Sequence, residues 1–137
     1  MNALKTAAII LLAAAGAASA QAPAPANDRL VPTVAPNGTV TATVDFGAEF
    51  SQMKGYIFTQ TVTTVAPGTG RPLHSHAGAP EIVRILSGTL TDSRNGGPPI
   101  AYGPGSTLIN AQGTQHMWAN LGKEPVVFVA TGVKPAT

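Results

Sequence analysis

Apolar residues recur along this chain in short stretches rather than at the spacing of an amphipathic helix. From about residue 38 onward the stretches are rich in β-branched side chains, which is typical of strands in a half-buried sheet. The pattern predicts seven or eight short strands, and the clearest lie at residues 39–46, 56–65, 81–86, 89–91, 107–109, 116–119 and 126–131. Such a series fits a sandwich or a barrel.

Turn-forming residues separate these stretches. Glycine supplies positive φ and proline fixes the entry to a turn, and both occur between the predicted strands, as in Ala66-Pro67-Gly68 and Gly103-Pro104-Gly105. Only residues 48–54 have the composition of a helical turn. With 15 Gly, 12 Pro and 10% charged residues in 137, the chain is predicted to be one all-β domain.

The first twenty residues have the pattern of a secretory signal peptide. Lys5 precedes an apolar run from Ala7 to Ala18, and the small residues Ala18-Ser19-Ala20 follow. The run is shorter than the roughly 20 apolar residues that a membrane span needs. We therefore expect cleavage after Ala20 and a periplasmic or secreted protein, with no membrane attachment afterwards.

Residues 21–37 contain four prolines and are predicted to be an extended tether, so that the domain occupies residues 38–137. Without Lys5, seven basic residues face six acidic ones. They are scattered, which argues against nucleic acid as a partner. Because the chain has no Cys, disulfides cannot stabilise the exported domain.

The three histidines of the chain all lie in two short segments flanked by glycine. His74 and His76 are two residues apart, so on an extended backbone both side chains point to the same face. A returning strand can bring the Glu81 carboxylate to the same point, and His116 adds a third imidazole. Three imidazoles and one carboxylate suit a divalent Fe, Mn, Ni, Cu or Zn ion better than Ca or Mg.

These two segments resemble the paired motifs of the cupin superfamily. In the first motif a Gly, five residues, His-x-His, four residues, Glu, six residues and a Gly follow one another. In the second motif a Gly, five residues, Pro-x-Gly, two residues, His, three residues and an Asn follow one another, although Ala111 stands where proline is usual. The matching positions are Gly68, His74, His76, Glu81 and Gly88 in the first motif, and Gly105, Gly113, His116 and Asn120 in the second.

The resemblance covers about residues 38–133 and implies a double-stranded β-helix, or jelly-roll, barrel. In the superfamily the residues at positions 74, 76, 81 and 116 bind a metal inside this barrel. Relatives of this kind are commonly dimers, and the outward positions expected for Ile82 and Leu86 agree with a homodimer.

Strand alternation gives expectations for the neighbouring side chains. Trp118 and Asn120 should point inward with His116, and Trp118 is more simply explained as core filling than as a pocket residue. Val83 and Ile85 should point inward with Glu81, whereas Ile82, Arg84 and Leu86 should point outward. Gln60 either faces the cavity beside Phe58 and Val62 or faces solvent. Tyr56 and Tyr102 are the phenols available for acid or base chemistry.

Three functions remain open from the sequence. The first is a dioxygenase-like oxidoreductase that binds a small enolic or phenolic substrate and O₂ at the metal. The second is a metal-dependent lyase or isomerase in which Tyr56 or Tyr102 removes a proton. The third is a non-catalytic ligand-binding protein with a structural metal. No catalytic residue is assigned, because the fold supports many chemistries.

Overall fold

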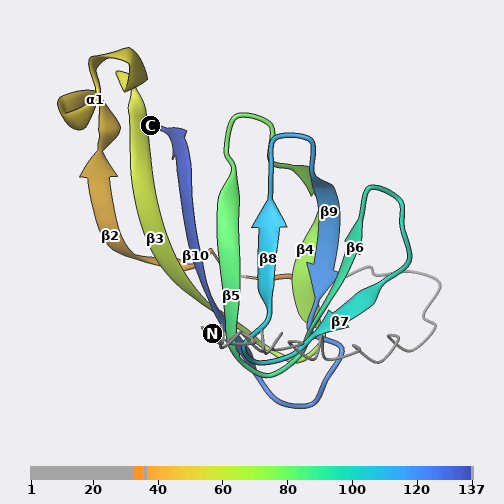
Figure 1. Ribbon diagram of the computed structural model, residues 1–137. Coiled ribbons are helices and arrows are strands. Elements are labelled where there is room, and N and C mark those ends of the chain that lie inside the picture. Colours follow the sequence, from red (N-terminus) through yellow and green to blue (C-terminus); the bar gives the residue numbers. More distant parts are fainter. Residues whose placement is uncertain (1–32, 36, 137) are drawn as a thin grey trace, which may run out of the picture.

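Alternating side chains along the strands build two five-stranded sheets that face each other (Figure 1). The computed structural model describes residues 33–35 and 37–136. One sheet has the strand order β1-β4-β9-β6-β7 and the other the order β2-β3-β10-β5-β8. In the described residues the strands are β1 Thr33–Val34, β2 Thr39–Asp45, β3 Tyr56–Val65, β4 Thr69–Ser75, β5 Glu81–Ser87, β6 Leu90–Arg94, β7 Ile100–Tyr102, β8 Thr107–Asn110, β9 Gln115–Ala119 and β10 Val126–Pro135. The all-β, double-stranded β-helix prediction is confirmed.

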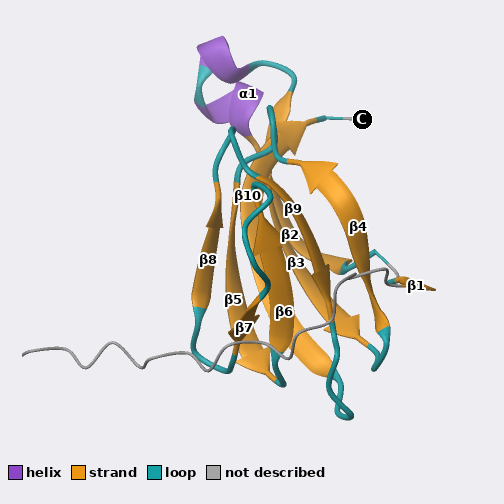
Figure 2. Cartoon of the chain, turned by 90° about the vertical axis from the view of Figure 1, so that its right-hand side faces the viewer, coloured by secondary structure: helices purple, strands orange, loops and turns teal. Residues whose placement is uncertain are grey.

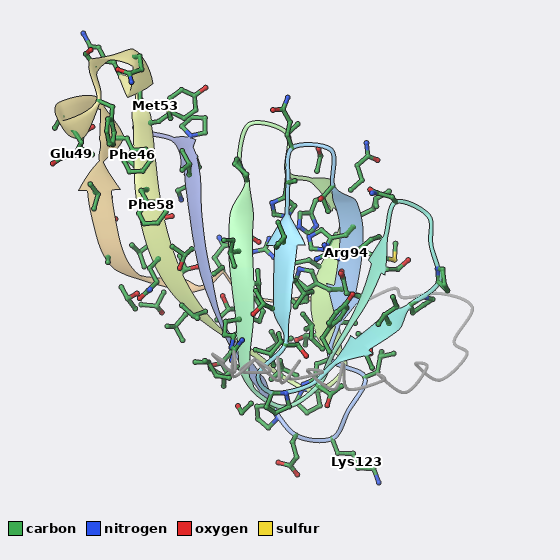
Figure 3. The ribbon with its side chains drawn as sticks, viewed as in Figure 1. Phe46, Glu49, Met53, Phe58, Arg94 and Lys123 are labelled. Atoms are coloured by element: carbon green, nitrogen blue, oxygen red, sulfur yellow. The ribbon has the colours of Figure 1, made fainter. Side chains whose placement is uncertain are left out.

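A short helix, α1 at Phe46–Glu49, and a 3₁₀ turn at Ser51–Met53 connect β2 to β3 at one end of the barrel (Figure 2). Asp45 caps α1 by accepting a hydrogen bond from the Gly47 backbone N–H. The Phe46 ring stacks on Phe58 of β3, with ring centroids 5.3 Å apart (Figure 3). The 3₁₀ turn lies within residues 48–54, where a helical turn was expected, and α1 begins two residues before that range.

The core lies between the two sheets and contains mostly aliphatic residues. On β5 the alternation is as predicted: Val83 and Ile85 are buried, whereas Ile82 and Leu86 are exposed. The turn after β5 packs closely on the start of β10, because a Cβ on Gly88 would lie 2.6 Å from the Pro125 carbonyl oxygen. Other buried core residues are Val65, Leu90, Leu108, Trp118, Val126, Phe128 and Ala130.

The structure contains strands that the sequence pattern did not reveal. β4 includes Gly70 and Pro72, which break the alternation of apolar residues, and its pairing with β9 shifts register between Arg71 and His74. Proline is tolerated in a strand at such an irregularity. β7 was missed as well, since its three residues follow Pro98 and Pro99.

The sheet also begins earlier than the expected boundary at residue 38. β1 pairs in parallel with β4, and the buried Ala35 donates its N–H to the Gly70 carbonyl. The signal peptide predicted at residues 1–20, and the tether as far as residue 32, lie outside the described residues. Among the residues that the structure describes, no helix is long and apolar enough to cross a membrane.

Candidate metal centre

Two neighbouring strands bring the three histidines together. The register of β4 against β9 places His74 directly opposite His116, and His76 follows one residue after the end of β4. Nitrogen atoms of the three side chains lie within 4.8 Å of one another. The ring centroids are 4.5 to 5.2 Å apart. His76 and His116 are buried and His74 is half-buried.

Each imidazole has its Nδ1 atom next to an oxygen acceptor. Nδ1 of His74 lies 2.8 Å from the Pro72 carbonyl oxygen and Nδ1 of His76 lies 3.1 Å from that of Ala79. Nδ1 of His116 lies 2.7 Å from Asp92 Oδ1. An oxygen acceptor requires the proton on Nδ1, so each neutral ring keeps its lone pair on Nε2. The surroundings thus select the tautomer that can bind a metal through Nε2.

The Nε2 atoms of His76 and His116 face each other at 2.9 Å in a buried setting. With both protons on Nδ1, two lone pairs meet at this distance and repel each other. A divalent cation bound by both nitrogens would turn this repulsion into attraction. The donor set therefore fits a transition metal that prefers imidazole ligands.

Glu81 lies at the edge of the histidine cluster. Its Oε1 atom is 3.8 Å from His76 Nε2, and the carboxylate accepts a hydrogen bond of 3.0 Å from Asn110 Nδ2. The close approach of β10 fixes this position, since a Cβ on Gly132 would lie 2.6 Å from the Glu81 Cβ. The structure brings all four expected ligands to one region, with the three histidines closest together.

Burial lowers the pKa of His74, and the neighbouring rings of His116 and His76 lower it further. The hydrogen bond with the Pro72 carbonyl and the Glu81 charge act in the opposite direction. The net effect favours the neutral imidazole, which is the form that binds metals.

Three polar residues beside the cluster were not singled out from the sequence. Asp92, Arg94 and Asn110 form hydrogen bonds that connect to His116 and Glu81. Asp92 and Arg94 are two residues apart, so a strand places them on the same face. The sequence held a clue, since aspartate is rare inside strands. The predicted strand, however, ended at Thr91.

Two cavities, each of about 200 Å³, adjoin the histidine cluster. His76 and Glu81 line both of them. The first also includes Thr59, Ser75, Ala79, Gly132 and Lys134. The second also includes Thr63, Arg71, His74, Trp118 and Phe128. A small ligand in either cavity would contact candidate metal ligands directly.

Of the two orientations left open for Gln60, the structure shows the one that faces solvent. The threonines Thr59, Thr61 and Thr63 line the cavities, and Gln60 is exposed on the other face of β3, where it accepts a hydrogen bond from Thr41. The buried Val65 fixes this register, because alternation from it turns the odd-numbered residues inward.

The aromatic residues divide between core and surface. Trp118 is buried as expected and meets Phe128 edge to face, at 5.6 Å between ring centroids, while also lining the second cavity. Tyr102 packs against the core, and Tyr56, the first residue of β3, is exposed. Neither tyrosine is among the described residues that line the two cavities.

Asn120 is fully buried, and its side chain forms hydrogen bonds with backbone groups of three other residues. Its side-chain amide donates to the carbonyls of Val65 and Glu124, and its oxygen accepts from the Gly122 N–H. These hydrogen bonds connect the end of β9 to the end of β3 and the start of β10.

Two facing sheets with three converging imidazoles define a double-stranded β-helix protein with a candidate metal centre inside its barrel. Residues 61–132 match the cupin domain family. This match spans more than half of the chain, so the chain belongs to the cupin family.

Relatives in plants support the same assignment. The chain is 30% identical over 93 residues to germin-like protein 1 of Brassica napus, and this match covers 65% of the chain and 45% of the relative. A germin-like protein, subfamily 3 member 1, of Arabidopsis thaliana is 30% identical over 90 residues, covering 63% of the chain and 43% of the relative. The chain thus matches less than half the length of these relatives.

Solved structures show the same fold. An uncharacterized protein with a double-stranded β-helix domain from Klebsiella pneumoniae superposes with a TM-score of 0.57 at 19% identity, covering 84% of this chain and 90% of that chain. A predicted oxalate decarboxylase from Thermotoga maritima gives a TM-score of 0.51 at 24% identity, covering 64% and 73% of the two chains.

Proposed function

We propose that this cupin is an exported, metal-dependent, dioxygenase-like oxidoreductase acting on a small oxygenated substrate. A divalent Fe, Mn, Ni, Cu or Zn ion would be held by His74, His76, Glu81 and His116. The observation that carries the proposal is the convergence of three imidazoles. Each of them has an oxygen acceptor beside its Nδ1 atom, so that Nε2 is left for the metal. When bound, such a metal supplies an electrophilic centre for substrate and O₂.

The second cavity indicates which substrates fit. Arg71 is the only arginine or lysine among the described residues that line this cavity, and His74 and Glu81 line it too. The Arg71 guanidinium contacts the Asn37 side-chain oxygen, which leaves further donors of its fork for a ligand. Trp118 and Phe128 supply an apolar wall. A small carboxylate with an apolar or enolic portion could bind the Arg71 guanidinium through its charge and contact the apolar wall with the rest of the molecule.

The carboxylate proposal is tested with Mn²⁺-loaded protein and malonate as the probe. Malonate should change the electron paramagnetic resonance spectrum of the bound Mn²⁺. We expect Arg71→Gln to weaken malonate binding by roughly ten-fold while metal content stays unchanged, since one charge-assisted hydrogen-bond pair is lost. Equal malonate affinity in both proteins would remove Arg71 from the substrate site.

The other two functions make different predictions. A lyase that uses Tyr56 or Tyr102 as its base requires a phenol near the metal, and neither lines the cavities. A pocket already filled by side chains would favour a non-catalytic protein with a structural metal, whereas cavities adjoin the histidines on two sides. Both observations favour the oxidoreductase.

The deciding experiment is elemental analysis of protein purified from the native exported fraction, followed by O₂-uptake assays with small carboxylates, enols and phenols. A stoichiometric transition metal and substrate-dependent O₂ consumption are the expected results. Bound metal with turnover but no O₂ uptake would favour the lyase. Bound metal with no turnover would favour the binding protein.

We further propose that two copies associate through the outer face of the β2-β3-β10-β5-β8 sheet. Ile82 and Ile109 are direct neighbours on β5 and β8, and both are exposed together with Leu86. Exposed aliphatic neighbours of this kind favour a protein partner. Light scattering should give the mass of a dimer for the wild type and of a monomer for Ile82→Lys.

A further inference from the structure

We propose that Arg94 is a positioning residue that connects the two sides of the metal centre, by holding His116 through Asp92 and Glu81 through Asn110. The inference rests on the proposed metal site and adds a residue to it. Arg94 ends β6, and its side chain reaches toward β8 (Figure 3). It therefore spans from one sheet to the other.

Two chains of hydrogen bonds start at the Arg94 guanidinium, and each is called an arm of the network. The first arm leads to His116. Arg94 Nε donates to Asp92 Oδ2, and Asp92 Oδ1 accepts from His116 Nδ1 at 2.7 Å. Asp92 is only 1% exposed, so its charge needs a buried partner. With both carboxylate oxygens engaged, the Asp92 side chain has one orientation. That orientation keeps the proton of His116 on Nδ1 and its lone pair on Nε2.

The second arm leads to Glu81. Arg94 Nη2 donates to Asn110 Oδ1 at 2.6 Å, and Asn110 Nδ2 donates to Glu81 Oε1 at 3.0 Å. A guanidinium can only donate, so it forces the amide oxygen of Asn110 toward itself. The amide NH₂ group must then point to Glu81. Arg94 thereby fixes the direction in which this hydrogen bond runs.

The two arms join ligands that come from different sheets. His116 lies on β9 in the first sheet, and Glu81 lies on β5 in the second. Arg94 also donates from Nη1 to the Ile109 carbonyl at 2.8 Å, which fixes the guanidinium against β8. Three donors in a planar fork serve this geometry, whereas the ammonium of a lysine offers a single point charge.

The first test compares Mn²⁺ and Zn²⁺ affinities, measured by chelator competition, for Arg94→Gln, Arg94→Lys and the control Arg84→Gln. Arg84 is exposed on β5 and donates to Thr107, away from the cluster. We expect both Arg94 variants to bind metal roughly 10- to 100-fold more weakly, as is usual when a partner of a metal ligand is lost. The control should match wild type. Affinities of the Arg94 variants within two-fold of wild type would overturn the proposal.

The second test does not need metal. Nitrogen-15 NMR of the metal-free protein should show a single Nδ1–H tautomer for His116 in wild type and Arg84→Gln. In Arg94→Gln the ring should lose this preference, whereas a merely stabilising side chain would leave the tautomer unchanged. An unchanged tautomer overturns the first arm. If the wild-type protein binds no metal but Arg94→Gln changes the tautomer of His116, the proposed function fails and the positioning role of Arg94 stands.

If the Arg94 variants do not fold, Asn110→Ala and Asp92→Asn test each arm separately. Asn110→Ala should weaken metal binding in wild type but not in a Glu81→Gln background, because its effect passes through Glu81. An equal loss in both backgrounds would contradict the second arm. Asp92→Asn should remove the single tautomer of His116, and retention of that tautomer would contradict the first.

Discussion

At the scale of single residues, the candidate metal centre depends on which atom of each side chain already has a hydrogen-bond partner. The oxygens of Pro72, Ala79 and Asp92 occupy the three Nδ1 atoms, so only Nε2 is left for a ligand. Two of these partners are backbone carbonyls. A substitution that keeps the backbone path would therefore leave the tautomers of His74 and His76 in place.

Glu81 supplies the anionic part of the proposed ligand set. Replacing it by Gln keeps the shape but removes the charge that offsets a divalent ion. We expect Glu81→Gln to weaken metal binding by roughly ten-fold or more, as measured by chelator competition. Arg84→Gln, on the opposite face of β5, is the matched control and should bind like wild type. Equal affinity for wild type and Glu81→Gln would leave a site of three histidines.

Single replacements of His76 and His116 test the buried nitrogen pair. His76→Ala and His116→Ala should each lose most of the bound metal, because each removes one of two Nε2 atoms that lie 2.9 Å apart. Elemental analysis after gel filtration gives the stoichiometry, and circular dichroism reports whether the barrel is folded. Stoichiometric metal in both folded variants would exclude these residues as ligands.

The candidate ligands could be predicted from the sequence, but the contacts that support them could not. His74, His76, Glu81 and His116 stand at fixed spacings, and spacing is visible in one chain. Asp92, Arg94 and Asn110 support the site through hydrogen bonds that join different strands, between residues 15 to 29 positions apart in the chain. Such contacts depend on the sheet order, which local patterns do not specify.

At the scale of elements, β10 positions the site by passing close to β5. Gly132 pairs with Glu81, and any side chain at this position would meet the backbone of Pro80 and Glu81. The same strand pairs with β3, and Ala130 and Gly132 both line the first cavity. Small residues here leave room for the carboxylate and for a ligand.

Gly132→Ala should therefore push Glu81 away from the histidines. We expect a loss of about 1–3 kcal/mol in unfolding free energy, which is typical of overpacking, together with weaker metal binding. Urea denaturation and chelator competition measure the two effects. Gly103→Ala is the control, because nothing lies within 4 Å of a Cβ there and no positive φ is required. If Gly132→Ala and Gly103→Ala have the same unfolding free energy, the close approach of β10 to β5 does not affect stability.

Strand prediction succeeded where apolar residues alternate and failed where they do not. Tyr56–Val65 was predicted to the residue, and its odd-numbered face is buried at Val65. β4 was not predicted, although it carries His74, because its sequence contains Gly70 and Pro72. β4 is held by β9 on one side and β1 on the other. Pairing partners, and not local propensity, make it a strand.

At the scale of the whole molecule, export would remove the first twenty residues. Ala18 and Ala20 place small side chains at the two positions that a signal peptidase reads. We expect mass spectrometry of the exported protein to find Gln21 at the amino terminus. The first described strand, β1, begins at Thr33, so cleavage after Ala20 would leave it intact. Soluble exported protein that retains Met1 would contradict the prediction.

Metal binding should stabilise the entire barrel, because His116 and Glu81 lie on strands of different sheets and a shared ion links them. A ligand that binds only the folded state adds about 2.7 kcal/mol at a concentration of 100 Kd. For a domain of about 100 residues this raises Tm by on the order of 10 °C. Differential scanning calorimetry with Mn²⁺ or Zn²⁺, before and after chelation, measures the effect.

Two controls test whether the stabilising ion binds at the histidines. The His116→Ala protein should show no such rise in Tm, and Mg²⁺ should have little effect on the Tm of wild type, since it prefers oxygen ligands. An equal rise in the His116→Ala protein would mean that the stabilising ion binds elsewhere.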